Sequence, residues 1–212
     1  MDKYLQYNLD RSALITIDTQ NDFTQENAPA FIAGTREVIP NMVRLLSAYR
    51  QKCLPIIHVV RFYLADGSNA ELCRKAKIES GHVMVVPGSE GAELVAALKP
   101  DRSVNLDAQA LLAGKFQQIG KNEFVMYKPR WGAFYQTNLE QFLGEKGINT
   151  LLFSGCNFPN CPRTSLYEAS ERDFRLIIAS DAMSQLYAKG EDELKNIGVT
   201  LLTTSEIVNL PA

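Results

Sequence analysis

The 212-residue sequence has little histidine and no clear excess of charge of either sign. Its two histidines, together with four cysteines that lack paired CxxC spacing, are too few for a Cys/His zinc cage. A formal net charge of −2, with the basic residues scattered, leaves no basic patch that would attract nucleic acid. We therefore expect neither a zinc cage nor a nucleic-acid partner.

Long apolar runs and nucleotide-binding loops are also missing from the sequence. No apolar run approaches the length that crosses a membrane, and residues 1–5 carry no apolar leader segment. No glycine-rich loop of the GxGxxG or Walker type follows a predicted strand, so dinucleotide binding is not expected. These features predict a cytoplasmic protein with reduced thiols and no membrane partner.

Hydrophobic residues make up 46% of the chain, which is enough for one well-packed core. No linker rich in Pro, Gly or Ser and no run of charge divides the sequence, and it contains no internal repeat. We therefore predict a single domain over residues 1–212.

Short apolar runs alternate with stretches of helical periodicity along most of the chain. Strands are predicted at residues 13–17, 54–62, 124–127, 150–154, 175–179 and 199–202. Helices are predicted at residues 35–52, after a Thr137/Glu140 capping box, after Cys161 and at 191–197. This alternation predicts an α/β fold, a three-layer sandwich in which helices cover both faces of a six-stranded parallel sheet.

Residues 64–120 fit this pattern less well. Helical periodicity appears at residues 69–78 and 91–98, and a turn-rich stretch separates the two pieces. We interpret the segment as an insertion that could cover the edge of the sheet.

Residues 151–165 read as a strand, a turn rich in Gly, Asn and Pro, and then a helix. Pro162 fits the first helical position, which puts Cys161 at or next to the N-cap. Free N–H groups and the positive end of the helix dipole favour a thiolate there, so the thiol is well placed to be a nucleophile. The alternative is an ordinary small core residue, which is the commonest fate of a cysteine.

Two further chemical groups follow predicted strands, the carboxylate of Asp18 and the amine of Lys128. The C-terminal ends of parallel strands share one edge of a sheet, so both should lie near Cys161. A carboxylate can take the proton of a thiol, and an ammonium group lowers the thiol pKa. Taken singly, Asp18 would be read as a turn former and Lys128 as a solvated strand end; their convergence with Cys161 favours catalysis.

Three motifs in this order resemble those of the isochorismatase-like cysteine hydrolases, over essentially the whole chain. This family includes nicotinamidases, N-carbamoylsarcosine amidase, ureidoacrylate amidohydrolase and biuret hydrolase. Residues 13–23 resemble its strand ending in Asp-x-Gln-x-Asp-Phe, and residues 128–134 its lysine motif. Residues 155–161 resemble its loop of a glycine, five variable residues and the nucleophilic cysteine.

The resemblance implies a Rossmann-like layout of six parallel strands and a catalytic triad of Asp18, Lys128 and Cys161. It also implies a cis peptide between Cys156 and Asn157, which would aim the backbone N–H groups of Asn157 and Cys161 at an oxyanion. No cofactor is implied, and the family suggests a homo-oligomer, either a dimer or a tetramer.

Nicotinamidases of this family bind a metal through an Asp-x-His pair after the second strand. Residues 59–66 contain no such pair, and His58 lies inside the strand, where a buried, hydrogen-bonded histidine is expected. We therefore predict no metal and disfavour nicotinamidase activity. Phe158 and Pro162 depart from the Thr and the aliphatic residue that the family often has there, which affects the expected pocket shape more than the chemistry.

Arg61 and Arg130 lie near predicted strand ends, and either could bind a carboxylate or polar carbonyl of the substrate; the alternative for each is a surface arginine. The candidate pocket walls are Phe23, Trp131, Tyr135 and Phe158. We predict hydrolysis of a small amide, carbamoyl or ureido substrate through a thioester. Two alternatives remain: isochorismate-type vinyl-ether hydrolysis, which needs no cysteine, and a non-catalytic binding or scaffold protein.

Overall fold

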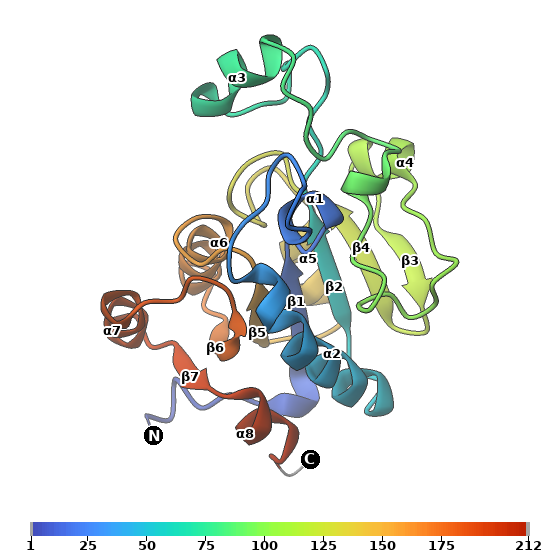
Figure 1. The fold of residues 1–212 in the computed structure, drawn as a ribbon. Helices are drawn as coiled ribbons and strands as arrows, with labels where there is room; N and C mark the ends of the chain where they lie inside the picture. Colours follow the sequence, from blue (N-terminus) through green and yellow to red (C-terminus); the bar gives the residue numbers. More distant parts are fainter. Residues whose placement is uncertain (1, 211–212) are drawn as a thin grey trace.

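A seven-stranded sheet forms the centre of the computed structural model, which describes residues 2–210 (Figure 1). The strands are β1 (Ser12–Ile17), β2 (Ile56–Val60), β3 (Gln117–Gly120), β4 (Glu123–Tyr127), β5 (Thr150–Gly155), β6 (Arg175–Met183) and β7 (Thr200–Leu202). Their order is β3-β4-β2-β1-β5-β6-β7, and every pairing is parallel except that of β3 with β4. Residues 1 and 211–212, the ends of the predicted domain, lie outside the described residues.

Helices cover both faces of this sheet. They are α1 (Asn21–Thr24), α2 (Thr35–Gln51), α3 (Leu72–Glu79), α4 (Ala108–Leu112), α5 (Leu139–Glu145), α6 (Cys161–Ser170), α7 (Ala188–Asn196) and α8 (Thr204–Val208), with 3₁₀ turns η1 (Leu9–Arg11) and η2 (Glu90–Ala92). Between residues 2 and 210, each helix is too short or too polar to cross a membrane.

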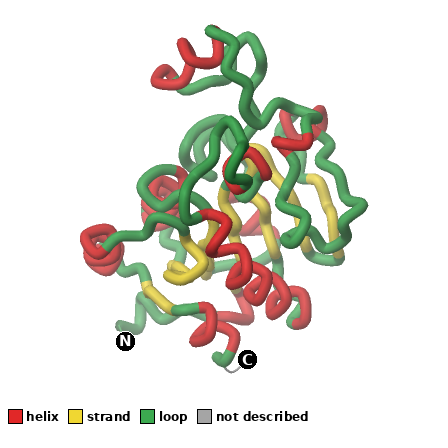
Figure 2. Tube along the Cα trace, viewed as in Figure 1, coloured by secondary structure: helices red, strands yellow, loops and turns green. Residues whose placement is uncertain are grey.

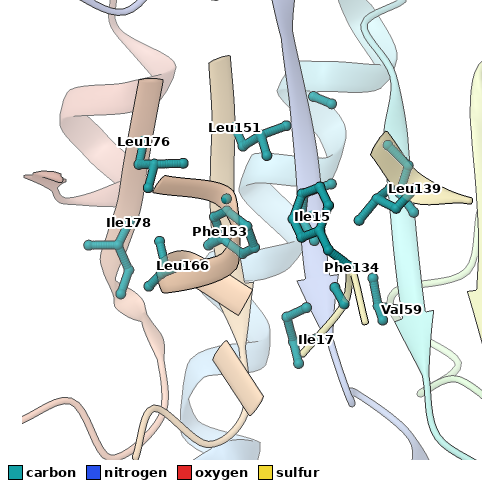
Figure 3. Close-up of a cluster of buried hydrophobic side chains, with 14 of the residues drawn as sticks. Ile15, Ile17, Val59, Phe134, Leu139, Leu151, Phe153, Leu166, Leu176 and Ile178 are labelled. Carbon is teal, nitrogen blue, oxygen red and sulfur yellow. The ribbon is translucent and has the colours of Figure 1, made fainter. Parts of the chain in front are cut away.

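The central strand β1 has buried side chains on both of its faces, as expected for a parallel sheet between two helical layers. Ile15 packs in one cluster with Leu139 of α5 and Leu166 of α6 (Figure 3). Leu14, on the opposite face, packs in a second cluster with Met42 of α2. Burying each such side chain stabilises the fold by about 1.5–3 kcal/mol. The predicted three-layer sandwich is confirmed.

The six predicted parallel strands are all present, and a seventh strand, β3, extends the sheet at one edge. This strand lies within residues 64–120, and its Gln117 and Gln118 give it no apolar alternation. The helix predicted at residues 91–98 is wrong, because the chain forms only η2 there and then a turn. Most of the segment between β2 and β3 is loop, and α3 stands beyond the C-terminal edge of the sheet (Figures 1 and 2).

The predicted capping box before α5 is also wrong. The N-cap of this helix is Asn138, which makes no side-chain capping bond. Thr137 instead donates its hydroxyl to the carbonyl of Ala133, and Glu140 pairs with Arg172 at 2.8 Å.

A buried polar network lies between β1, β2 and β4. His58 Nε2 lies 2.8 Å from Glu123 Oε1, and His58 Nδ1 lies 2.7 Å from Thr16 Oγ1, which confirms the expected buried, hydrogen-bonded histidine. Arg50 donates to both carboxylate oxygens of Glu123, at 2.7 and 2.8 Å. Burial alone would raise the pKa of Glu123, but the hydrogen bonds and charges of Arg50 and His58 hold it below its ordinary value.

Replacing Glu123 by Gln should lower the free energy of unfolding at pH 7 by about 3 kcal/mol, because Arg50 loses the buried carboxylate with which it pairs. The pKa of Glu123 is lowered on folding, so its contribution is present above the unfolded-state pKa, whose ordinary value is 4.5, and is lost as the pH falls through the lower folded-state pKa. The difference in unfolding free energy between the wild type and Glu123→Gln, measured by urea unfolding, should therefore shrink below about pH 4. Glu171→Gln, at an exposed site, should change stability by less than about 0.5 kcal/mol. Equal stability of wild type and Glu123→Gln at pH 7 would contradict the network's role.

Candidate active site

Asp18 follows β1 directly and is held by both neighbouring strands. Its N–H donates to the carbonyl of Val59 at 2.9 Å, and its carbonyl accepts from Cys156 Sγ at 3.0 Å. Its backbone is left-handed, with φ of 52°, a conformation that Asp tolerates better than most residues other than glycine. Asp18 is 5% exposed, so its carboxylate lies inside the protein at the C-terminal edge of the sheet.

The rest of the Asp-x-Gln-x-Asp-Phe motif fixes the loop around Asp18. Gln20 accepts from the N–H of Arg61 at 2.8 Å and donates to the carbonyls of Arg61 and Ala92, which ties the chain after β2 to the chain after β1. Asp22 accepts from the N–H of Val85 at 2.5 Å. Gln20 and Asp22 thus anchor the long segment between β2 and β3 at the C-terminal edge of the sheet.

Lys128 is the first residue after β4 and is 1% exposed. Its backbone N–H donates to the carbonyl of Val60 at 3.0 Å, which extends the pairing of β4 with β2 by one residue. Its Nζ lies 3.0 Å from Asp18 Oδ2, 3.2 Å from Cys161 Sγ and 3.2 Å from the carbonyl of Arg130. The ammonium group therefore bridges the carboxylate and the sulfur.

Cys161 is the first residue of α6, and Asn160 is its N-cap. Ser165, one turn later, donates to the carbonyl of Cys161 at 2.7 Å and accepts from the N–H of Ala133 at 3.0 Å. This hydroxyl joins the start of α6 to the loop after Lys128. The turn before the helix needs glycine at Gly155, where φ is 119° and a Cβ would lie 2.3 Å from the carbonyl oxygen of Ile17.

The peptide between Cys156 and Asn157 is cis, as the sequence resemblance implies. Among residues 2–210, no protein acceptor takes the backbone N–H of Asn157 or that of Cys161. Two free N–H donors therefore lie in the same turn as the sulfur, and donors of this kind can bind an oxyanion.

Burial raises the pKa of the Cys161 thiol to about 12, and the negative charge of Asp18 adds to this effect, while Lys128 only partly opposes it. This corrects the expectation that the helix end and the ammonium group favour a thiolate. For Lys128, burial alone would lower the pKa, but the negative charge of Asp18 raises it above its ordinary value. The site at rest holds an ammonium–carboxylate pair beside a neutral thiol.

A small cavity of about 10 Å³ lies over these three side chains. Its walls are Asp18, Phe23, Ile32, Arg61, Tyr63, Glu71, Arg74, Lys128, Trp131, Cys156, Asn157 and Cys161. The structure therefore brings together seven of the side chains that the sequence singled out: Asp18, Phe23, Arg61, Lys128, Trp131, Asn157 and Cys161.

Three other predicted substrate-binding residues lie outside this cavity wall, which corrects their assignment. Phe158 is fully buried and packs edge-on against Tyr187, with ring centroids 5.4 Å apart. Tyr135 is 46% exposed. Arg130 directs its Nη1 to the carbonyls of Pro129 and Asn69.

Arg61 lines the cavity, but its guanidinium group is committed to the protein. It is 1% exposed and donates to Glu71 Oε1 at 3.3 Å, to Tyr127 Oη at 3.0 Å and to the carbonyls of Phe62 and Asn69. These hydrogen bonds hold the segment that follows β2 in place.

The sequence analysis does not assign five residues of the cavity wall to the site: Ile32, Tyr63, Glu71, Arg74 and Cys156. Glu71 and Arg74 come from residues 64–120, where no motif is recognisable and only the helical periodicity of residues 69–78 is visible. Nothing in that periodicity indicates that the start of α3 reaches the cavity.

The model of the isochorismatase domain matches residues 12–206 of this sequence, a range that contains the whole sheet and the site. The chain belongs to the isochorismatase family.

Relatives of this isochorismatase-family protein include amidohydrolases. A probable inactive nicotinamidase of Arabidopsis thaliana is 30% identical over 201 residues, covering 92% of this chain and 93% of the plant protein. An N-carbamoylsarcosine amidase of Arthrobacter is 27% identical over 173 residues, covering 82% of this chain and 59% of the relative. A solved isochorismatase family protein of Desulfovibrio vulgaris has a TM-score of 0.80 and 31% identity, covering 93% of this chain and 96% of that one.

The side chains near β2 do not fit a metal site of the kind expected for nicotinamidases. In the stretch from residue 2 to residue 210, no three His, Cys, Asp or Glu side chains gather in a group that could hold a metal ion. Both ring nitrogens of His58 are engaged by Thr16 and Glu123. We derive no chemistry through a metal.

Alkylation by iodoacetamide tests the raised thiol pKa of this isochorismatase-family site. At pH 8, Cys161 should react more slowly than the exposed Cys53, because its thiol has a pKa of about 12. Asp18→Asn should speed alkylation of Cys161 several-fold, because it removes a negative charge that raises this pKa. Peptide mass spectrometry over time measures both rates.

The matched control is Asp10→Asn, at an exposed aspartate, which should leave the rate at Cys161 unchanged. Faster reaction of Cys161 than of Cys53 in the wild type would show that a thiolate already exists at rest.

Proposed function

We propose that this protein is a cysteine-dependent amidohydrolase that cleaves the C–N bond of a small amide, carbamoyl or ureido substrate. The observation that supports it most strongly is the position of Lys128 Nζ, 3.0 Å from Asp18 Oδ2 and 3.2 Å from Cys161 Sγ, at the wall of a buried cavity. The amidohydrolases among its relatives support the same class of reaction.

Acylation begins from the neutral thiol. Asp18 takes the thiol proton as Cys161 Sγ attacks the carbonyl carbon, so that thiolate forms only during the attack. The C–S bond forms, and the π electron pair of the carbonyl moves to its oxygen. The free N–H groups of Asn157 and Cys161 then bind this oxyanion.

Loss of the amine completes the thioester. Asp18, now protonated, gives its proton to the leaving nitrogen as the C–N bond breaks and its electron pair goes to nitrogen. Ammonia or an amine departs, and the acyl group stays on Cys161. Lys128 keeps its proton, because the negative charge beside it, which lies on Asp18 at rest, raises its pKa above the ordinary value, and its role is electrostatic.

Deacylation repeats these steps with water. Asp18 removes a proton from a water molecule that attacks the thioester carbonyl, and the same backbone donors bind the oxyanion. The C–S bond then breaks, sulfur leaves with the electron pair and regains the proton from Asp18. A carboxylic or carbamic acid is released, and the site returns to its starting state.

Two other functions are compatible with the family. Isochorismate-type vinyl-ether hydrolysis needs no sulfur nucleophile, whereas here the sulfur lies at the cavity wall beside an acid–ammonium pair. A non-catalytic binding protein has some support from the name of the plant relative, which describes it as a probable inactive nicotinamidase. The substitution of Cys161 separates the thioester route from both of these functions.

Wild-type protein should release ammonia from at least one member of a panel of small primary amides and ureas. Cys161→Ala should lower that rate by about 10⁴-fold or more, because the covalent route is lost. Mass spectrometry after acid quench should detect an acyl adduct on Cys161 in the wild type alone. Cys53→Ala, at an exposed cysteine away from the cavity, is the matched control and should retain full activity.

The remaining outcomes favour the competing functions. Turnover that survives Cys161→Ala would exclude the thioester route. Absence of turnover across the panel, together with binding of panel compounds that is unaffected by Cys161→Ala, would favour the binding protein.

A further inference from the structure

Arg74 lies in the first turn of α3 and its side chain forms part of the cavity wall. The centre of its guanidinium group is 4.6 Å from the ring centroid of Trp131 and 5.5 Å from that of Tyr63. Its Nη1 donates to the hydroxyl of Tyr63. Two aromatic rings and one hydrogen bond thus hold the guanidinium group in place.

The acids that could neutralise Arg74 are engaged elsewhere. Glu71 accepts from Arg61 Nε at 3.3 Å with one oxygen and from Tyr63 Oη at 2.8 Å with the other. Over residues 2–210, no carboxylate lies within ion-pair distance of Arg74, and Tyr63 Oη is the single acceptor of its guanidinium group. The Nε and Nη2 donors of Arg74 therefore have no protein acceptor in that range.

The cavity has one positive charge in excess. Its basic side chains are Arg61, Arg74 and Lys128, whereas its acidic ones are Asp18 and Glu71. Lys128 is paired with Asp18 and Arg61 with Glu71, which leaves the charge of Arg74. A half-buried charge without a partner is costly, and a bound anion would offset that cost.

We propose that Arg74 determines substrate specificity by binding a carboxylate of the substrate, so that the substrate is a monoanionic amide. This inference rests on the proposed amidohydrolase function, because it assigns the part of the substrate that does not react. The planar fork of a guanidinium group suits a carboxylate, which accepts two parallel N–H bonds. The cavity, at about 10 Å³, is far smaller than the roughly 300–1,000 Å³ of pockets that hold drug-sized ligands, so the site favours a small molecule.

Succinamate and succinamide make a matched pair of probes, since they differ only in carboxylate against carboxamide at the end remote from the reacting amide. The wild type should prefer succinamate. Arg74→Met should lower kcat/KM for succinamate by about 100-fold, mainly through KM, because a charged partner of the ligand is lost. For succinamide the same variant should change kcat/KM by less than about 3-fold. Arg102→Met, at an exposed arginine that is not part of the cavity wall, should alter neither value.

Arg74→Lys is a second variant that tests the same proposal if Arg74→Met fails to fold. A lysine keeps the charge without the planar fork, so it should reduce activity toward succinamate by about 10-fold and leave succinamide unchanged. Equal losses on both substrates, in either variant, would overturn the inference and assign Arg74 a structural role.

Binding separates the failure of this inference from the failure of the proposed function. In the Cys161→Ala background, calorimetry should show that Arg74→Lys weakens binding of succinamate and leaves binding of succinamide unchanged. Arg74-dependent binding without any turnover by the wild type would refute the amidohydrolase and retain the carboxylate receptor. If the wild type turns over substrate but Arg74→Lys does not weaken binding of succinamate, the amidohydrolase is retained and the carboxylate-binding role of Arg74 is refuted.

Discussion

The contact on which this site depends is the one between the buried ammonium group of Lys128 and the carboxylate of Asp18. An ammonium group that is 1% exposed loses its hydration, and this costs several kcal/mol unless an opposite charge lies close by. Asp18 supplies that charge from β1, while Cys161 supplies its sulfur from the start of α6. The sheet must therefore close at this edge in one register, with β1, β4 and β5 all ending at the same level. A shift of one residue in β1 or β4 would leave a buried charge without its partner, and a shift in β5 would move the sulfur away from both.

The same electrostatics shape the proposed chemistry. A thiol near an ammonium group is usually expected to lose its proton, yet here that ammonium group is paired with a carboxylate and the sulfur is buried. Burial and the charge of Asp18 together outweigh Lys128, so the pKa of Cys161 rises to about 12. Reactivity then depends on transfer of the thiol proton to Asp18 during attack.

The sequence was sufficient to predict the six parallel strands and the meeting of Asp18, Lys128 and Cys161, because these depend on apolar runs and on the shared edge of parallel strands. It was not sufficient for β3, whose glutamines show no apolar alternation. The thiol pKa was misjudged because helix position and neighbouring charge are visible in a sequence, whereas depth of burial is not. Arg130, Tyr135 and Phe158 were assigned to the pocket from their closeness in sequence to the motifs, but short separation along the chain does not fix which way a loop residue faces.

Arg61 and Arg74 show how burial divides two arginines that line one cavity. Arg61 follows β2 directly, where full burial requires that its donors find protein acceptors, so Glu71, Tyr127 and two carbonyls engage it. Arg74 comes from α3, outside the sheet, and is only half-buried, so its remaining donors can stay free without the full desolvation cost. Arg61, which the sheet places directly at the cavity, is thus less available to a ligand than Arg74. Segment 64–120, interpreted from sequence as a cover for the sheet edge, supplies the free charge instead. The sheet edge would then provide the chemistry and a separate segment the recognition, so substitutions in α3 would alter the substrate without disturbing Lys128 and Asp18.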